Sequence, residues 1–463
     1  MKEQIPNFID NNLFANHFLE KRLKEVDEWT SNFDETKKSF QKIYNLYHKN
    51  KKRGRLEAAN ESQTQRRWID KVLEHLGHGE SYVLEETYQT AANKMLRPDY
   101  TFVNEDKWDD LPNSAYAFGD AKRYGSNLDK ASDKNDNTNP SYQIYNYIER
   151  LRVDWGILTN GRKWRLYSYE DCAPDTYYEV DLIKILEKYD PSTQEGVHEA
   201  LNLYKYFHLF FAKSSFEGKQ NFLSKVLENS FLYEKDLEED LEDKVYLALE
   251  TTVKGFFETN NIEKTSENIE KIHKNSLVFL YRVLFILNAE SRELLPVKSQ
   301  VYTKRLSLQH LLKEIVERNN MYEFSEDTFL WKNRLQTLFQ DIDKGKTYGN
   351  FEITSYNGGL FSEEEHPFLA KNNLKGTYIE QILTFLGIGQ DTEGNEVLLD
   401  YRDLNIRHLG SIYEGLLDHK FQVAQEDLVL KNNEWTPVKD NTSSSSKIAR
   451  KGELYLTNDS SER

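Results

Sequence analysis

Two short motifs bring together residue types that suit metal-assisted hydrolysis. Asp99 stands in the motif RPDY (97–100), and Asp120 and Lys122 stand in GDAK (119–122) at the end of the next expected strand. Because side chains alternate along a strand, Asp120 and Lys122 project to one face, and a paired neighbouring strand adds Asp99 to that face. Two carboxylates with room for water suit Mg²⁺, for which Mn²⁺ can substitute. A lysine beside them can orient or help deprotonate an attacking water, so the pattern indicates phosphodiester hydrolysis.

The same three residues also allow an ordinary structural interpretation. Asp99 could cap a turn, and Asp120 and Lys122 could form an ion pair on an edge strand. The pattern D-x-K alone occurs by chance in most proteins, and only its combination with PD across a hairpin of this length is moderately specific. Both interpretations therefore stay open at this point.

Two expected helices beside these strands carry further candidates. Glu61, in ESQTQ (61–65), lies where a helix packed against the sheet could offer another carboxylate to the metal. Gln143 and Tyr147 stand four positions apart and so share one face of the following helix. That pair could meet the lysine side of the site or a DNA phosphate, so we take Gln143 as a catalytic candidate and Tyr147 as a DNA contact. An ordinary helix surface is the alternative for both.

Charge is distributed unevenly along the chain. The 61 Lys and Arg against 77 Asp and Glu give a net charge of −16, yet residues 35–68 hold ten basic and three acidic residues, a net charge of +7. Binding to nucleic acid depends on the local field and not on the net charge, so this segment is a candidate contact for the backbone of double-stranded DNA. A solvated helix and loop is the alternative. The residues chosen as DNA contacts are Lys51, Lys52, Arg53 and Arg55.

Hydrophobic periodicity predicts the elements that position these residues. Two helices are expected within 10–50, a third from Asn60 to a stop at Gly77, and a fourth at about 140–152. Asn160-Gly161 is a strong hairpin signal between the last two strands. The layout is that of an α/β or α+β domain with a central mixed sheet flanked by helices. The expected strands are 81–86, 99–103, 115–121, 154–159 and 163–169.

The remainder of the chain changes character twice. Its pattern is almost wholly helical up to about residue 420, and the clearest helical segments are 195–212, 237–258, 266–290 and 305–319. After residue 420 it has short strands around a serine run at 443–446. We therefore expect four parts. They are N-terminal helices (1–55), the domain that carries the candidate site (56–190), a mostly α-helical connector domain (191–420) and a short β/loop tail (421–463).

Composition favours a soluble, helix-rich protein of the cytoplasm that does not enter a membrane. Hydrophobic residues make up 38% of the 463 residues, and nine Pro and 21 Gly are few for this length. The single Cys172 excludes an internal disulfide and a cysteine-based zinc cluster, which fits a reducing compartment. The longest apolar run, 277–287, is interrupted by Arg282 and is too short to span a bilayer. No secretory signal is visible at the N-terminus.

The order of the motifs resembles the PD-(D/E)XK nuclease domain of restriction enzymes. The segments that carry the resemblance are the Glu61 helix, RPDY, GDAK, the Gln143/Tyr147 pair and ILTNGRKWRLY (157–167). The resemblance implies a restriction-endonuclease-like fold in which Asp99 and Asp120 bind the metal and Lys122 is the catalytic lysine. It also implies that Glu61 often joins the metal ligands, and that Gln143 and Tyr147 match an accessory motif.

Three downstream segments, 276–297, 357–369 and 407–421, resemble the connector of type IIG restriction enzymes. Those enzymes fuse a nuclease, a helical connector, an adenine-N6 methyltransferase and a target-recognition domain. In that family the methyltransferase begins soon after a segment like GELYL (452–456), whereas this sequence ends at Arg463. FLGIG (385–389) follows a helix instead of a strand, and NPSY (139–142) lacks the second proline of a catalytic NPPY. We therefore expect a chain without methyltransferase and target-recognition domains, or a fragment of a longer fusion.

These observations lead to one functional hypothesis and one rival. The hypothesis is a Mg²⁺-dependent DNA endonuclease subunit of a restriction or anti-phage defence system, a type II-like site-specific deoxyribonuclease. The resemblance implies that it acts with a separate adenine-N6 methyltransferase/target-recognition subunit or with further defence-system subunits. The rival is a non-catalytic DNA-binding or scaffold subunit of such a complex. The joint presence of both carboxylates and the lysine favours the enzyme.

Overall fold

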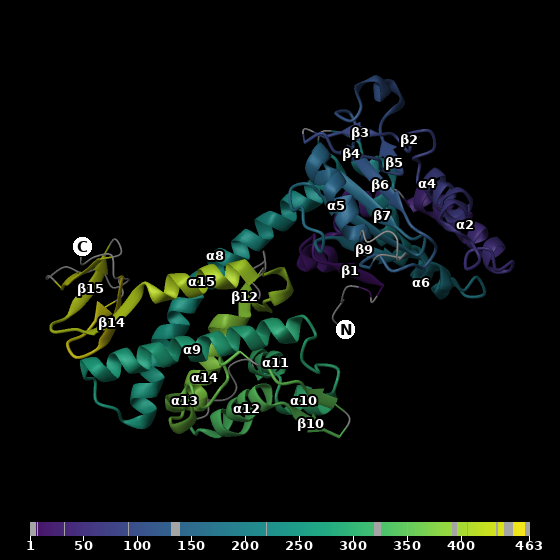
Figure 1. The fold of residues 1–463 in the computed structure, drawn as a ribbon. Coiled ribbons are helices and arrows are strands. Elements are labelled where there is room, and N and C mark those ends of the chain that lie inside the picture. The colour runs from purple at the N-terminus through teal and green to yellow at the C-terminus, as the bar shows by residue number, and fades with distance from the viewer. Residues whose placement is uncertain are drawn as a thin grey trace. The chain divides into compact units, whose positions relative to one another are not determined.

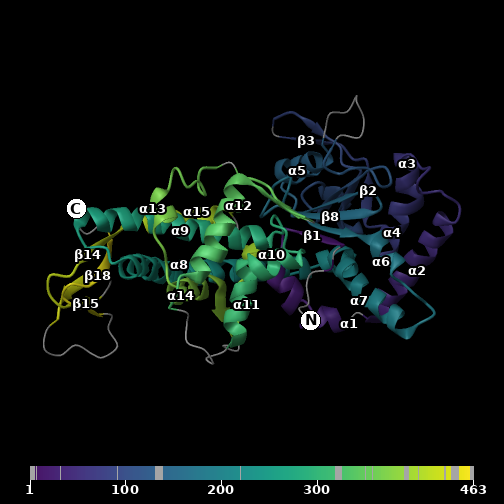
Figure 2. The same ribbon diagram turned by 90° about the horizontal axis from the view of Figure 1, so that it is seen from below.

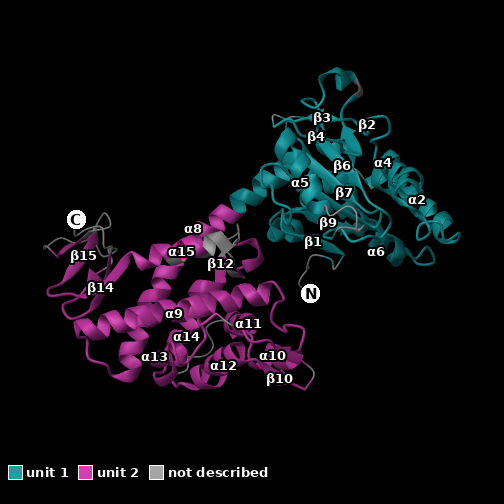
Figure 3. Ribbon diagram, in the orientation of Figure 1, with its two compact units in different colours: residues 1–233 teal, residues 234–463 magenta. Residues whose placement is uncertain are grey.

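The structure of this protein is a computed structural model with two compact units. It describes residues 6, 8–31, 33–90, 92–130, 139–218, 220–318, 326–349, 351–356, 358–390, 396–404, 406–431, 434–438 and 448–458. The units are residues 1–233 and 234–463, coloured separately in Figure 3, and their boundary falls within one long helix, α8 (Phe222–Asn260). The serine run at 443–446 lies outside the described residues. The division into four parts stays a prediction.

The first unit is built on a mixed sheet of seven strands (Figure 1). The strands are β1 (Ile9–Asn11), β2 (Tyr82–Leu84), β5 (Tyr100–Phe102), β6 (Ala117–Ala121), β7 (Trp155–Thr159), β8 (Lys163–Ser168) and β9 (Tyr178–Asp181). Their order across the sheet is β1-β9-β8-β7-β6-β5-β2, with β6 and β7 parallel and all other neighbours antiparallel. A separate pair of strands is formed by β3 (Tyr88–Gln89) and β4 (Met95–Leu96).

All five strands expected from the sequence are confirmed within one to three residues. The hairpin at Asn160 is also present, since the Asn160 side chain accepts hydrogen bonds from the N–H groups of Arg162 and Lys163. Gly161 is needed at this turn because its φ is +76° and a Cβ would lie 2.7 Å from the Trp68 ring. β1 and β9 were not expected. Residues 9–11, assigned to a helix from the sequence, instead pair with residues 178–180.

Helices cover both faces of the sheet. α5 packs on one face through Ile144, Tyr147 and Ile148, in a core that includes Phe118 and Leu158. A larger core on the opposite face contains apolar side chains of α2, α4, α6 and α7. The helices of this unit are η1 (Phe18–Arg22), α1 (Asp27–Ser31), α2 (Phe33–Lys51), α3 (Glu61–Thr64), η2 (Gln65–Ile69), α4 (Asp70–His75), η3 (Glu105–Asp110), α5 (Pro140–Leu151), α6 (Leu182–Glu187), α7 (Gln194–Phe211) and η4 (Lys213–Phe216).

The second unit confirms the expected helical region and the short strands near the C-terminus. Its helices, in addition to the end of α8, are α9 (Ser266–Ser291), α10 (Gln300–Arg305), α11 (Leu308–Arg318), η5 (Trp331–Leu335), α12 (Gln336–Lys344), α13 (Pro367–Lys371), α14 (Gly376–Gly387), η6 (Tyr401–Asp403) and α15 (Ile406–Leu417). α9 is central, since it contacts α11, α13 and α15 (Figure 2). The first three residues of FLGIG are the end of α14 and the last two lie in the strand Ile388–Gln390, so the motif stands at the end of a helix, as the sequence indicated.

Four small sheets accompany these helices. Two of them, β10 with β11 and β12 with β13, fall inside the region expected to be helical. The others join β14 with β18, and β15 with β16 and β17. The strands are β10 (Lys346–Tyr348), β11 (Phe351–Ile353), β12 (Ile388–Gln390), β13 (Glu396–Leu398), β14 (His419–Val423), β15 (Leu428–Lys431), β16 (Glu434–Pro437), β17 (Ile448–Ala449) and β18 (Leu454–Asn458).

Candidate functional site

The two candidate metal ligands stand opposite each other on neighbouring strands. Tyr100 of β5 pairs with Gly119 of β6, so Asp99, directly before β5, faces Asp120 in the continued register. Opposed residues of an antiparallel pair point to the same face, with Cβ atoms about 5 Å apart. Phe118, two residues before Asp120, packs in the core beneath α5. Alternation along the strand therefore places Asp120 and Lys122 on the α5 face of the sheet.

Asp99 is fixed by a contact with the neighbouring strand. Its Oδ2 atom accepts a hydrogen bond of 2.7 Å from the backbone N–H of Ala121. Burial raises the pKa of Asp99, against the lowering effects of this hydrogen bond and of the Lys122 ammonium. The carboxylate is thus held beside β6, and this contact is different from the turn cap that the structural interpretation expects.

Asp120 is the most deeply buried carboxylate of the site, with 1% of its surface exposed. Its Oδ2 atom lies 2.5 Å from Lys122 Nζ. Apart from this ion pair, Oδ2 has no hydrogen-bond partner among the described residues. Burial raises the pKa of Asp120 to about 7, and the carboxylates of Asp99 and Glu61 add to the rise against the opposing effect of Lys122. The ion pair of the structural interpretation is therefore present, but β6 is a central strand and not an edge strand.

Lys122 is the first member of a chain of polar contacts that reaches α5. Its Nζ atom donates to Gln143 Oε1 at 3.0 Å, and Gln143 Nε2 donates to the Tyr147 hydroxyl at 2.7 Å. Tyr147 in turn donates to the carbonyl oxygen of Arg97 at 3.1 Å. Burial alone lowers the pKa of Lys122, but the attraction of Asp120 outweighs it and the pKa is raised above its ordinary value. The ammonium form is the one that this site stabilises.

Gln143 and Tyr147 therefore face the lysine side of the site, one of the two positions expected for them. Tyr147 is only 5% exposed and its hydroxyl is bonded within the protein. A direct contact between Tyr147 and DNA stays a prediction, which this burial does not favour.

Glu61 lies at the start of α3, at the rim of the site. Asn60 caps this helix in a capping box with Gln63, which fixes where the helix begins. Trp68, further along the same helical segment, donates from its indole N–H to the Gly161 carbonyl at 2.6 Å and so ties the segment to the β7–β8 turn. The Glu61 side chain is exposed, yet it is close enough to raise the pKa of both Asp120 and Lys122.

The donor set fits a magnesium ion held by two protein carboxylates. Across the ranges that the structure describes, no three His, Cys, Asp or Glu side chains are grouped so that they could hold a metal ion together. Glu61, Asp99 and Asp120 thus do not form a three-ligand group. Mg²⁺ is commonly held by one or two carboxylates and completes its shell with water and phosphate oxygens. The otherwise unpartnered Oδ2 of Asp120 is a suitable oxygen donor for such an ion.

The four basic residues expected to contact DNA lie at the end of α2 and in the turn after it, and all are exposed. Lys51 forms an ion pair of 2.6 Å with Glu187, which also accepts a hydrogen bond from Tyr47. Lys51 is thus bound within the unit. Lys52, Arg53 and Arg55 stay predicted contacts for a DNA backbone.

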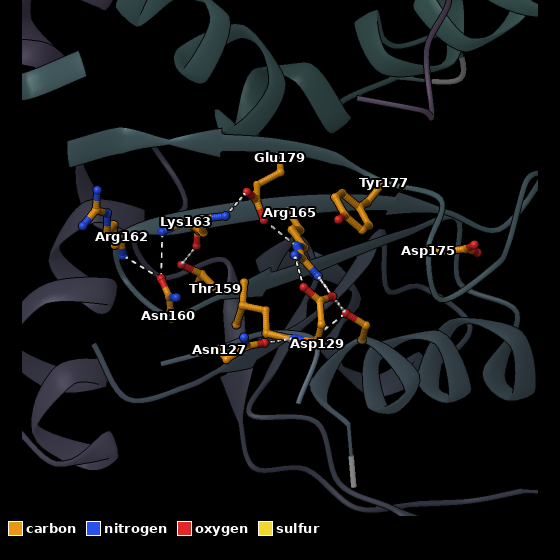
Figure 4. A network of polar contacts seen from close by, with 12 residues as sticks. Asn127, Asp129, Thr159, Asn160, Arg162, Lys163, Arg165, Asp175, Tyr177 and Glu179 are labelled. Atoms are coloured by element: carbon orange, nitrogen blue, oxygen red, sulfur yellow. Dashed lines mark hydrogen bonds and ion pairs between the residues drawn. The ribbon is translucent and has the colours of Figure 1, made fainter. Parts of the chain in front are cut away.

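A second charged cluster shares the sheet face of the candidate site, and the sequence did not reveal it. Arg165 of β8 is 2% exposed and pairs with Glu179 and Asp129 (Figure 4). The alternation of Lys163, Arg165 and Tyr167 along one strand could have indicated a polar face. A buried arginine in an aromatic-rich strand was not recognised because its partners come from distant segments.

One comparison with known proteins gives a distant relative that is named as a restriction-modification protein. No family model matches the sequence. A protein of Methanocaldococcus jannaschii, provisionally named as a type II restriction enzyme and methyltransferase, is 22% identical over 396 residues, which include 79% of this chain and 31% of that protein. A cryo-EM structure of a DrdV–DNA complex contains a chain that is 12% identical, with 83% of this chain and 28% of that chain covered and a TM-score of 0.22.

The chain is therefore distantly related to this provisionally named protein of Methanocaldococcus jannaschii, and it spans about a third of that relative's length. A further finding concerns membranes. Among the residues described here, no helix combines the length and the apolar character that crossing a bilayer requires.

Proposed function

We propose that this chain is the nuclease-bearing part of a restriction or anti-phage system and that it hydrolyses phosphodiester bonds of foreign DNA with Mg²⁺. The observation that carries the proposal is the convergence of Asp99, Asp120 and Lys122 on one face of the sheet. They surround a carboxylate oxygen that has, within the described part of the chain, no partner besides the lysine. A relative that is named as a restriction enzyme supports the same class of substrate. In this proposal the first unit has a PD-(D/E)XK fold.

Asp99 and Asp120 would hold the metal, with Mn²⁺ as a substitute for Mg²⁺. When bound, such an ion neutralises charge on the phosphate and lowers the pKa of a water molecule. Glu61 stands at the rim, where an exposed carboxylate can accept hydrogen bonds from water in the site. Burial raises the pKa of Asp120, whereas the positive charge of a bound cation lowers it. Metal binding therefore favours the ionised carboxylate.

Lys122 orients the attacking water and stabilises charge on the phosphoryl oxygens. Its raised pKa keeps it protonated at neutral pH, so it donates hydrogen bonds and does not act as a base. An ammonium group has three N–H donors, of which the contacts with Asp120 and Gln143 use two. Gln143, held by Tyr147, fixes the direction of the ammonium group and leaves one donor for substrate or water.

The basic turn after α2 would contact the DNA backbone, which supplies affinity but no sequence information. Sequence specificity would come from a partner, an adenine-N6 methyltransferase/target-recognition subunit or further defence-system subunits. The connector helices and the short strands of the second unit would dock that partner.

The proposal is tested by cleavage of unmodified plasmid DNA with Mg²⁺ or Mn²⁺. Wild-type protein is compared with Lys122→Ala and Asp120→Asn, and with Asp154→Asn as a control that removes a carboxylate at the opposite end of β7. We expect wild type and Asp154→Asn to cut, and the two site variants to lose at least about 100-fold in rate, as is typical of lost charge stabilisation. Equal cutting by all four proteins would eliminate the site. Metal-independent DNA binding without cleavage, also after the proposed methyltransferase/target-recognition partner is added, would support the non-catalytic scaffold instead.

A further inference from the structure

A network of charged and hydroxyl groups surrounds Arg165, on the same sheet face as the candidate site (Figure 4). Its Nε atom donates to Glu179 at 2.6 Å, and its two terminal nitrogens bind both carboxylate oxygens of Asp129 at 2.6 and 2.9 Å. One of these nitrogens also donates to the Ser141 hydroxyl at 2.8 Å. The guanidinium group lies 4.0 Å from the centre of the Tyr177 ring. Arg165 is buried and uses all three of its side-chain nitrogens in these contacts, while the Asp129 side chain is 55% exposed.

The strand register aligns this network with the candidate site. Asp120 pairs with Leu158, Leu158 with Arg165, and Arg165 with Glu179. Arg165 therefore lies two strands from Asp120 in the same row, a separation of about 10 Å. This distance is too great for a direct contact with the reacting atoms. Any role of Arg165 in the chemistry acts through intermediate residues.

Arg165 holds two segments that carry residues of the site. The first is the loop segment 122–130 after β6, which begins at Lys122 and is held by Arg165 through Asp129. The second is the N-terminal end of α5, where Ser141 precedes Gln143 by two positions. Ser141 also joins the two segments to each other, because its N–H and its hydroxyl both donate to the Leu128 carbonyl at 3.2 and 3.0 Å.

The N-terminal end of α5 depends on this polar anchoring. Gln143 lies in the first turn of the helix, and the apolar side chains that seat the helix on the sheet, from Ile144 onward, follow it in sequence. The first turn of a helix has unsatisfied N–H groups and frays readily unless it is held. The anchors before Gln143 are the Asn139 cap, the buried Pro140, and Ser141.

We propose that Arg165 and Asp129 are positioning residues that hold the Lys122–Gln143 contact in its active geometry. The network locks the loop that follows Lys122 against the first turn of the helix that carries Gln143. When the network is broken, Gln143 can move away from the Lys122 ammonium group. The ammonium group is then no longer held in one orientation. The inference rests on the proposed nuclease function for its catalytic consequence, while the positioning itself is independent of activity.

Asp129 is the residue to change. Replacing Arg165 removes a buried cation that pairs with the buried Glu179, to which Lys163 also bonds, and breaking a buried ion pair is commonly strongly destabilising. In Asp129→Ala, by contrast, Arg165 keeps Glu179 and Ser141 as partners. Asp129→Glu retains a carboxylate and tests whether that carboxylate restores the cleavage rate. Asp175→Ala is the matched control, since Asp175 is an exposed aspartate of the same unit, drawn apart from Arg165 in Figure 4, and its removal changes the charge equally.

Two measurements are made on the full chain. The first is the single-turnover rate of DNA cleavage with Mg²⁺, together with DNA affinity. The second is the rate at which acetic anhydride labels Lys122, followed by mass spectrometry, with Lys71, an exposed lysine of α4 outside the network, as an internal reference. We expect Asp129→Ala to cleave about 10- to 100-fold more slowly at unchanged DNA affinity, the size of effect that a misplaced group produces. Labelling of Lys122, whose side chain is 13% exposed, rises relative to Lys71. Asp129→Glu restores most of the rate, and Asp175→Ala behaves as wild type.

Three outcomes separate the alternatives. Unchanged cleavage and unchanged Lys122 labelling in Asp129→Ala overturn the positioning role. Tighter DNA binding with unchanged cleavage overturns it as well, and identifies Arg165 as a DNA contact that Asp129 covers. If wild-type protein does not cleave at all, the proposed function fails, and the labelling of Lys122 alone decides whether Asp129 positions it.

Discussion

Replacing Asp120 by asparagine should stabilise the metal-free protein at neutral and alkaline pH. Burial raises the pKa of Asp120 from its ordinary value of 3.8 to about 7, so the folded state disfavours the ionised carboxylate that the unfolded chain carries freely. For an acid with a raised pKa, the contribution of Asp120 to the free energy of unfolding is greatest below pH 3.8 and falls as the pH rises toward 7. A pKa difference of about three corresponds to about 4 kcal/mol, the upper limit of the gain.

The gain is smaller than this limit because the substitution also deprives Lys122 of its ion-pair partner. We expect Asp120→Asn to be more stable than wild type by about 2 kcal/mol at pH 8 and by about zero at pH 4. Urea unfolding at both pH values, with EDTA present, measures the difference. With Mg²⁺ added at pH 8, wild type gains stability and the variant does not. If Asp120→Asn is the less stable protein at pH 8 without metal, the carboxylate serves as an ordinary structural ion pair and the argument from its burial is wrong.

Three further predictions follow from individual contacts. Gln143→Leu removes the acceptor of Lys122 and should slow cleavage about 10-fold, while Tyr142→Ala, which changes the exposed neighbouring side chain, should leave the rate unchanged. Alanine at Lys52, Arg53 and Arg55 together should weaken DNA binding and reduce the slope of log K against log salt by up to about 2.7, and an unchanged slope would exclude this turn from the interface. Burial lowers the pKa of His78 to about 4, so its contribution to stability is complete above pH 6.5 and is lost as the pH falls to 4, a loss of about 3 kcal/mol. A His78→Gln variant unfolded in urea across this pH range should show a correspondingly flatter dependence.

Local patterns were sufficient to predict the core of the first unit. Strands β6, β7 and β8 have side chains buried on both faces of the sheet, so their β-branched and aromatic runs were unambiguous. The hairpin at Asn160 and the helix that ends before Gly77 follow from turn and cap chemistry. Spacing in D-x-K, combined with alternation along a strand, was sufficient to place Asp120 and Lys122 on one face.

Pairing between segments far apart in the sequence limited how much of the remaining structure could be predicted. β1 has only three residues, and it pairs with β9 across more than 160 residues of chain, which no short window of sequence can reveal. β9 contains Glu179 and Asp181, two charged residues in four, and these are buried because Arg165 and Arg162 pair with them. Glu61 shows a further limit. Its helix was predicted correctly, but whether its side chain reaches the two aspartates depends on the angle of that helix to the sheet.

The proposed nuclease activity requires one divalent ion that Asp99 and Asp120 share. A crystal of the protein soaked in Mn²⁺, with data collected at the manganese absorption edge, tests this without reference to activity. We predict one anomalous peak that contacts both carboxylates and is lost in Asp120→Asn. A peak elsewhere, or no peak at a Mn²⁺ concentration that stabilises the protein in solution, would contradict a metal site shared by these two carboxylates.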